Sequence, residues 1–179
     1  MFARRNEGAV LFRDVRDHTT YLTMLDFVVR RFGWRCLAYC LMPNHMHLLV
    51  ETPQPNLAAG MQRLHGDYGR WFSNRRRTPG HVFGSRYGAV RTQDDTQLLS
   101  VAAYLALNPV AAGLAPEPER WRWGSHNALT GRERAPGFLD VARLPELLAG
   151  SLGGDGRRRY AAYVSDRRAV AERTPGSGR

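Results

Sequence analysis

Apolar residues recur at helical spacing in three segments of the chain. This spacing predicts helices over residues 17–32, 57–76 and 94–107. Acidic residues at the helix starts, and glycine or proline at the ends, supply the expected boundaries. The predicted boundary residues are Asp17 and Gly33 for the first helix, and Asp94 or Asp95 and Asn108–Pro109 for the third.

Two runs rich in apolar and aromatic residues flank Pro43–Asn44, a pair that favours a tight turn. Residues 34–42 and 45–51 are therefore predicted to form a β-hairpin. The remaining strands are expected within residues 81–91, and in residues 1–5 or 8–12. The resulting order, βαββαβα, predicts an α+β fold of the ferredoxin-like (split βαβ) type, an antiparallel sheet with helices on one face.

Beyond Gly113 the chain becomes rich in proline, glycine and arginine, with shorter helices expected at 139–149 and 157–168. We expect residues 1–115 to form the main domain and residues 116–168 a C-terminal helical extension. The composition of residues 169–179 predicts a disordered tail.

Composition narrows the class of protein. The apolar runs are far shorter than the roughly 18 residues that span a bilayer, and the N-terminus has no apolar core of signal-peptide length. We therefore expect a cytoplasmic protein without membrane contact. Two cysteines, Cys36 and Cys40, exclude a disulfide framework and a cysteine-built zinc site. Both are interpreted as small buried hydrophobic residues.

The formal net charge of +10 favours a polyanionic partner such as nucleic acid. All 26 basic residues are arginine, and they concentrate in residues 60–92 and 157–179. Arginine pairs with phosphate and aromatic faces stack on unpaired bases, so the first segment is predicted to contact DNA. The alternative is a solvated helix end with core aromatics. The predicted contact residues are Arg70, Arg75, Arg76, Arg77, His81, Phe83, Arg86, Tyr87 and Arg91.

The sequence His45-Met46-His47 lies in the second predicted hairpin strand. Side chains at alternate strand positions point to the same face, so the two imidazoles lie side by side while Met46 faces the other way. Paired imidazoles at this spacing can bind one divalent ion. A chance surface pair of histidines is the alternative.

Tyr104 and Asn108 lie four residues apart near the end of the third predicted helix, and therefore share a face. The amide oxygen of asparagine suits Mg²⁺ or Mn²⁺, and a tyrosine hydroxyl can form a covalent intermediate. The alternatives are a core aromatic for Tyr104 and a C-cap before Pro109 for Asn108.

Three motifs, in this order and spacing, resemble those of the REP-associated tyrosine transposases, relatives of the single-tyrosine insertion-sequence transposases of the HUH class. The motifs are Tyr39 to Glu51 (YCLMPNHMHLLVE), Gly80 to Tyr87 (GHVFGSRY) and Tyr104 to Leu114 (YLALNPVAAGL). The resemblance implies that His45, His47 and Asn108 are metal ligands and that Tyr104 is the nucleophile.

The resemblance implies a transposase that cleaves and transfers single-stranded DNA near a hairpin, through a 5′-phosphotyrosine. Mg²⁺ or Mn²⁺ would be its only cofactor, and the chain would act as a monomer or homodimer. The family usually has basic residues at two positions where this chain has Gly88 and Ala111. The alternative is therefore a catalytically inactive module that binds structured single-stranded DNA. A further alternative is an RNA-binding sheet, although the chain lacks the aromatic sheet signature of that class.

Overall fold

The computed structural model describes residues 2–4, 10–77, 82–83, 87–149 and 155–173. The chain divides into two compact units. The first comprises Met1–Arg91 with Gly137–Asp140, and the second comprises Thr92–Pro136 with Val141–Arg179. Within the described residues, no helix combines the length and the apolar character needed to cross a membrane.

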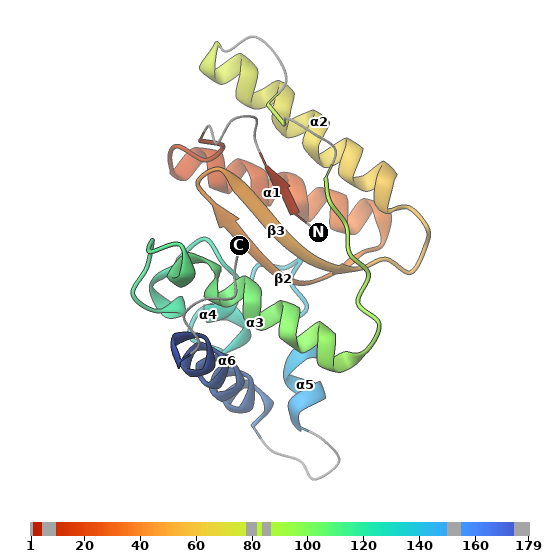
Figure 1. Ribbon diagram of the computed structural model, residues 1–179. Helices are drawn as coiled ribbons and strands as arrows, with labels where there is room; N and C mark the ends of the chain where they lie inside the picture. Colours follow the sequence, from red (N-terminus) through yellow and green to blue (C-terminus); the bar gives the residue numbers. More distant parts are fainter. Residues whose placement is uncertain (1, 5–9, 78–81, 84–86, 150–154, 174–179) are drawn as a thin grey trace. The chain divides into compact units, whose positions relative to one another are not determined.

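The first unit is an antiparallel sheet with two long helices, which confirms the expected α+β class. Its sheet has the strand order β1-β3-β2, so β3 pairs with both neighbours. Helices α1 and α2 pack against each other, and α1 contacts β2 (Figure 1). The elements are β1 Phe2–Arg4, α1 Val15–Phe32, β2 Arg35–Met42, β3 His45–Glu51 and α2 Leu57–Arg76.

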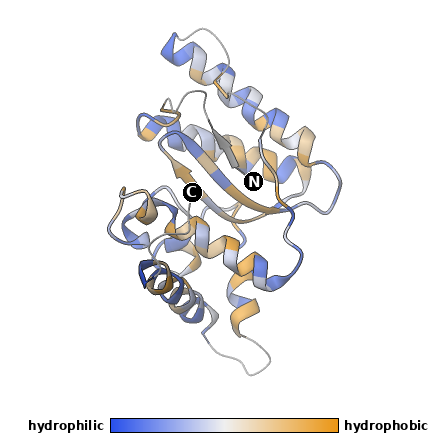
Figure 2. Cartoon of the chain, in the orientation of Figure 1, coloured by the Kyte–Doolittle hydropathy of each residue, from blue (hydrophilic) through white to orange (hydrophobic). Residues whose placement is uncertain are grey.

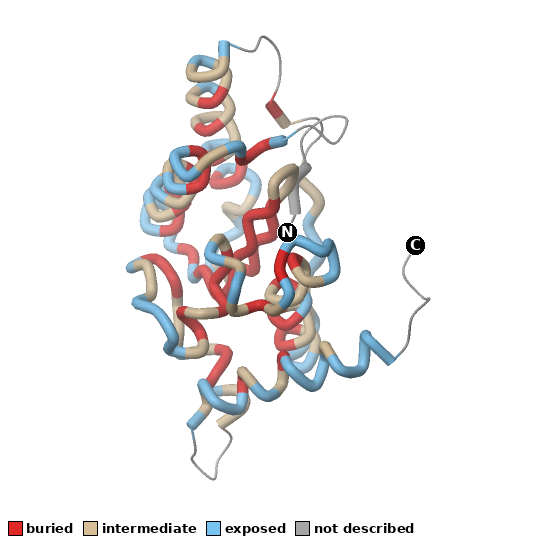
Figure 3. The backbone as a smooth tube through the Cα atoms, turned by 90° about the vertical axis from the view of Figure 1, so that its left-hand side faces the viewer, coloured by how far each residue is buried: buried red, intermediate tan, exposed pale blue. Residues whose placement is uncertain are grey.

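Strand β2 is buried from Cys36 to Met42, and Figure 3 draws the buried residues of the chain in red. Its hydrophobic colouring in Figure 2 matches this burial. Residues 137–140 contribute to the burial, because Leu139 forms a parallel bridge with Cys36 and the Phe138 ring lies 5.8 Å from the Tyr39 ring. Both cysteines are buried, as expected, and burial raises the pKa of Cys36 to about 12.

One local prediction for this unit is wrong. Asp14, not Asp17, is the N-cap of α1, and its carboxylate accepts a hydrogen bond from the Asp17 amide at 3.1 Å. The strand expected within residues 81–91 lies partly outside the described residues. In the described part, Phe83 and Gly88 are isolated bridge residues, and the Phe83 ring stacks on His65 of α2 with ring centroids 4.1 Å apart.

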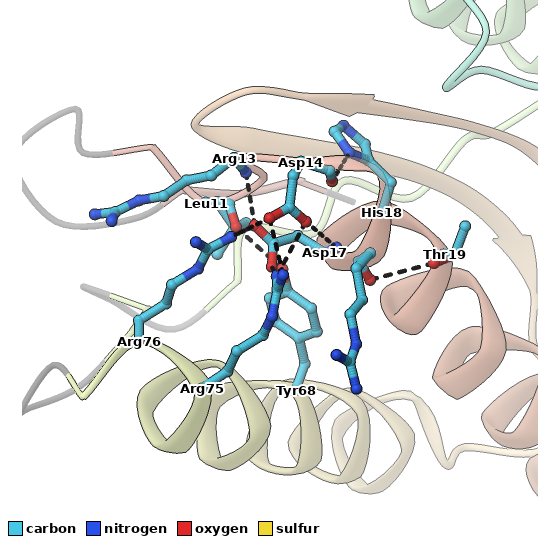
Figure 4. Close-up of polar contacts among 10 residues, drawn as sticks. Leu11, Arg13, Asp14, Asp17, His18, Thr19, Tyr68, Arg75 and Arg76 are labelled. Carbon is cyan, nitrogen blue, oxygen red and sulfur yellow. Dashed lines mark hydrogen bonds and ion pairs between the residues drawn. The ribbon is translucent and has the colours of Figure 1, made fainter.

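A cluster of ion pairs joins the start of α1 to the end of α2 (Figure 4). Arg75 donates to both oxygens of Asp14, at 3.0 and 2.9 Å, and also to Asp17. Arg76 donates to Asp14 and to Asp17, at 2.7 Å each. Asp17 has no exposed side-chain surface, so its charge is balanced entirely inside the protein. We refer to Asp14, Asp17, Arg75 and Arg76 as the ion-pair cluster.

The second unit is helical. Helix α3 contacts α6 and the short helix η2, and α5 contacts α6. The elements are α3 Asp95–Ala111, η2 Pro118–Arg120, α4 His126–Leu129, α5 Arg143–Ala149 and α6 Gly156–Arg173. Asp94 is the N-cap of α3, one of the two predicted possibilities, and accepts from the Gln97 amide at 2.7 Å.

Three predicted boundaries in this unit differ from the structure. Helix α3 continues through Pro109 to Ala111 instead of closing at Asn108–Pro109. Helix α5 begins only at Arg143, because residues 137–140 belong to the first unit. Helix α6 extends to Arg173 and so includes part of the expected tail, while residues 174–179 lie outside the described residues.

Replacing Asp17 with asparagine leaves Arg75 and Arg76 without one charged partner in a buried setting. We expect Asp17→Asn to lower the free energy of unfolding by about 3 kcal/mol, the scale for breaking a buried pair. Urea unfolding followed by circular dichroism measures this. The control is Asp26→Asn, which removes a surface pair with Arg30 and should cost less than about 1 kcal/mol. Equal losses in the two variants would contradict the structural role of Asp17.

The hydrogen bonds from Arg75 hold the pKa of Asp14 well below its ordinary value. A carboxyl group with a lowered folded-state pKa stabilises the fold above its unfolded pKa, near 3.9, and loses this contribution as the pH falls through the folded value. Unfolding free energies measured between about pH 4 and pH 2 should fall less steeply in Asp14→Asn than in the unmodified chain. Parallel curves for the two proteins would contradict this assignment.

Candidate functional site

The register of the hairpin decides which face of the sheet carries the two histidines. His45 is opposite Met42 and His47 is opposite Cys40, so these four residues share one face. Met46 and its partner Leu41 lie on the other face, as the sequence predicted for Met46. The two imidazole rings are 4.8 Å apart between centroids and nearly perpendicular. His47 is buried and His45 is half-buried.

The turn before His45 is held by backbone hydrogen bonds from a distant segment. The amides of Leu11 and Phe12 both donate to the carbonyl oxygen of Pro43, at 2.6 and 2.9 Å. The Tyr68 hydroxyl of α2 in turn donates to the Leu11 carbonyl at 3.0 Å. Helix α2 and the turn are thus joined through one short segment, which restricts how His45 can move.

Asn44, which the sequence predicted only as part of a turn, contacts the first of the two histidines. Its Oδ1 lies 2.7 Å from Nδ1 of His45. When Nδ1 carries the proton and donates it to Asn44, Nε2 has the lone pair that binds a metal. The position of Asn44 directly before His45 in the sequence could have predicted this contact.

Tyr104 and Asn108 lie on the continuous part of α3, four residues apart. Tyr104 is 56% exposed, which excludes its interpretation as a core aromatic. Asn108 lies inside the helix and its carbonyl accepts from the Ala112 amide at 3.0 Å, which excludes its interpretation as the C-cap. The four predicted catalytic and metal residues therefore form two pairs, His45 with His47 in the first unit and Tyr104 with Asn108 in the second.

The two imidazoles of His45 and His47 could hold a divalent ion if a further oxygen ligand joined them. That ligand is not a third histidine, cysteine or acidic side chain among the described residues. Among the described residues, no group of three or more His, Cys, Asp and Glu side chains forms a metal cage. Two imidazoles with an amide or phosphate oxygen give a mixed nitrogen and oxygen set, which Mn²⁺ and Mg²⁺ tolerate. An asparagine such as Asn108 supplies an oxygen of this kind.

The predicted DNA-contact residues have different surroundings. Arg75 and Arg76 belong to the ion-pair cluster, and Arg70 pairs with Asp67. Arg77 and Arg91 are exposed, and Tyr87 is partly exposed. Phe83 is half-buried and its ring stacks on His65, whose pKa burial lowers to about 4. His81 and Arg86 lie outside the described residues.

Comparisons with known proteins identify a similar fold and a family. The fold is similar to that of a REP-associated tyrosine transposase solved in complex with a REP hairpin, with a TM-score of 0.58 and 15% sequence identity over 78% of this chain and 79% of that one. No curated protein matches the chain. The sequence model described as "Transposase IS200 like" matches residues 1–108, more than half of the 179 residues. The chain therefore belongs to the IS200-like transposase family.

Proposed function

We propose that this chain cleaves and rejoins single-stranded DNA, with the hydroxyl of Tyr104 as the nucleophile. The exposure of Tyr104 is the observation that carries the proposal. The large apolar residues Leu98, Leu99 and Leu105 of the same helix are buried, whereas the Tyr104 side chain is 56% exposed. A side chain exposed to this extent is accessible to a substrate, as a nucleophile must be.

The proposed reaction is a transesterification. The Tyr104 oxygen attacks the phosphorus of a DNA phosphodiester, and the bond from phosphorus to the 3′ oxygen breaks. The tyrosine loses its proton and the departing 3′ oxygen gains one, which leaves a 5′-phosphotyrosine and a 3′-hydroxyl end. A 3′-hydroxyl, from the same strand or another, then attacks the phosphotyrosine and restores a phosphodiester. The ester link keeps the bond energy, so the cycle needs no nucleotide cofactor.

The proposed ligands of a divalent ion are His45, His47 and Asn108. When bound, Mg²⁺ or Mn²⁺ would offset the charge that develops on the phosphate oxygens. Asn44 orients His45 through the bond between its Oδ1 and the ring Nδ1. The shared carbonyl of Pro43 fixes the turn from which both residues extend.

The proposed substrate is single-stranded DNA that carries a hairpin. The structural neighbour of this chain was solved with a REP hairpin, and its fold matches across more than three quarters of both chains. The formal net charge of +10 supports a polyanionic substrate. Arg77 and Arg91, both exposed, supply cations from the segment that the sequence predicted to contact DNA.

Tyr104→Phe should abolish the covalent product while leaving DNA binding intact. We would mix the protein with Mg²⁺ or Mn²⁺ and a labelled library of single-stranded hairpins, then separate the products on a denaturing gel. The unmodified chain should give a protein–DNA band that disappears with EDTA. The matched control is Tyr163→Phe, since Tyr163 also carries its hydroxyl near the surface, against Arg167. DNA binding by the unmodified chain without any covalent band would contradict catalysis and identify a binding module.

The metal proposal predicts graded effects at the hairpin turn. His45→Ala should remove the covalent product at any practical Mn²⁺ concentration. Asn44→Ala removes only the orienting contact, and should raise the Mn²⁺ concentration needed for half-maximal product by about tenfold. Titration of Mn²⁺ against product formation measures both, with Asn74→Ala, an exposed residue of α2, as the control. An unchanged Mn²⁺ dependence in both turn variants would contradict the ligand assignment.

A further inference from the structure

The two carboxylates of the ion-pair cluster differ in their access to water. The Asp14 side chain is 40% exposed, whereas the Asp17 side chain is 0% exposed. The side chains of Arg75 and Arg76 lie between these extremes, at 26% and 21% exposed. The cluster therefore has one carboxylate fixed inside the protein and a second at the surface, with both arginines bound to each (Figure 4).

Asp14 binds the arginines in the geometry that also suits a phosphate. Both terminal nitrogens of Arg75 donate to it, one to each oxygen, at 3.0 and 2.9 Å. A terminal nitrogen of Arg76 adds a third hydrogen bond at 2.7 Å. A guanidinium fork accepts a carboxylate or a phosphate with the same pair of parallel hydrogen bonds.

We propose that Arg75 and Arg76 form a binding site for a backbone phosphate of single-stranded DNA, and that the Asp14 carboxylate occupies this site in the DNA-free protein. The inference rests on the proposed function, because it takes DNA as the ligand. It assigns Asp14 the role of an internal competitor, which lowers the affinity of the two arginines for phosphate until DNA displaces it.

The exchange leaves the buried part of the cluster intact. Asp17 keeps its bonds to Arg75 and Arg76, so no buried charge loses its partner. Asp14 is already partly hydrated, and its bond from the Asp17 amide can persist after the arginines are released. Helix α1 therefore keeps its N-cap while the phosphate is bound.

The surroundings favour an anion at this position. The exposed Arg77 directly follows the two arginines, and the exposed Arg13 directly precedes Asp14 in the chain. The Arg13 amide also donates to Asp17 at 2.8 Å, which places its backbone beside the cluster. Four arginines thus accompany two carboxylates, and this local surplus of positive charge attracts a phosphate.

The test is Asp14→Asn, which removes the competing charge while keeping a side chain that caps helices well. Binding of labelled oligothymidylate is measured by fluorescence anisotropy over a series of salt concentrations, with EDTA present so that no cleavage occurs. We expect Asp14→Asn to bind about tenfold more tightly than the unmodified chain, the scale of one hydrogen-bonded charge contact. The slope of log affinity against log salt should stay the same, because the unmodified chain makes the same phosphate contacts once Asp14 is displaced.

The matched control is Asp26→Asn, which also removes one carboxylate of α1 and releases one arginine, Arg30, but at the exposed surface. Tighter binding by Asp14→Asn alone supports the proposal. Equal tightening in both variants overturns it, because net charge then explains the effect. Unchanged affinity in Asp14→Asn also overturns it, while the covalent assay on Tyr104 remains an independent test of the proposed function.

A second measurement follows DNA binding in the unmodified chain, and a variant serves only to assign one signal. With isotope-labelled arginine, the side-chain NMR signal of Arg75, assigned by its loss in Arg75→Lys, should shift when oligothymidylate is added. Excess inorganic phosphate should weaken this shift by competing for the fork. An Arg75 signal that stays in place while other arginine signals move overturns the proposal. If no arginine signal moves, both the proposed site and the DNA substrate are rejected.

Discussion

The buried carboxylate of Asp17 is the constraint on which the first unit depends. A charge without access to water is tolerated only where other charges and hydrogen-bond donors surround it. Here the partners are Arg75 and Arg76, at the far end of a helix that begins forty residues later in the chain. Because the buried carboxylate of Asp17 needs these two arginines, the end of α2 must stay against the start of α1. Since the hairpin lies between these two helices in the chain, fixing both helices also restricts the position of its strands.

The sequence predicted those features of the candidate site that depend on neighbouring residues in the chain. The alternation of His45, Met46 and His47 was sufficient to place both imidazoles on one face, because strand geometry is local. The spacing of Tyr104 and Asn108 was likewise sufficient, because both lie within two turns of one helix. The motifs that carry the family resemblance are also local runs of sequence, and the match over residues 1–108 confirms the family they indicated.

The contacts that the sequence did not predict join residues distant in the chain. Arg75 and Arg76 bind Asp14 and Asp17, which lie about sixty positions away. A basic segment taken by itself contains no sign of these acidic partners, and the predicted contact of both arginines with DNA stays a prediction. Asp14 caps α1 in place of Asp17, because Asp17 is turned inward toward the same two arginines. Phe83 packs on His65 of α2, eighteen positions earlier in the chain.

Pro109 makes the last turn of helix α3 easier to unwind than the rest of the helix. A proline has no amide hydrogen, so within this helix it cannot donate to the Leu105 carbonyl one turn earlier. The ladder of backbone hydrogen bonds is thus interrupted just after Asn108. The turns that follow Asn108 are therefore held by fewer backbone hydrogen bonds than an uninterrupted helix end would have. The turn of α3 that carries Tyr104 and Asn108 can then stay helical while the residues after Pro109 unwind.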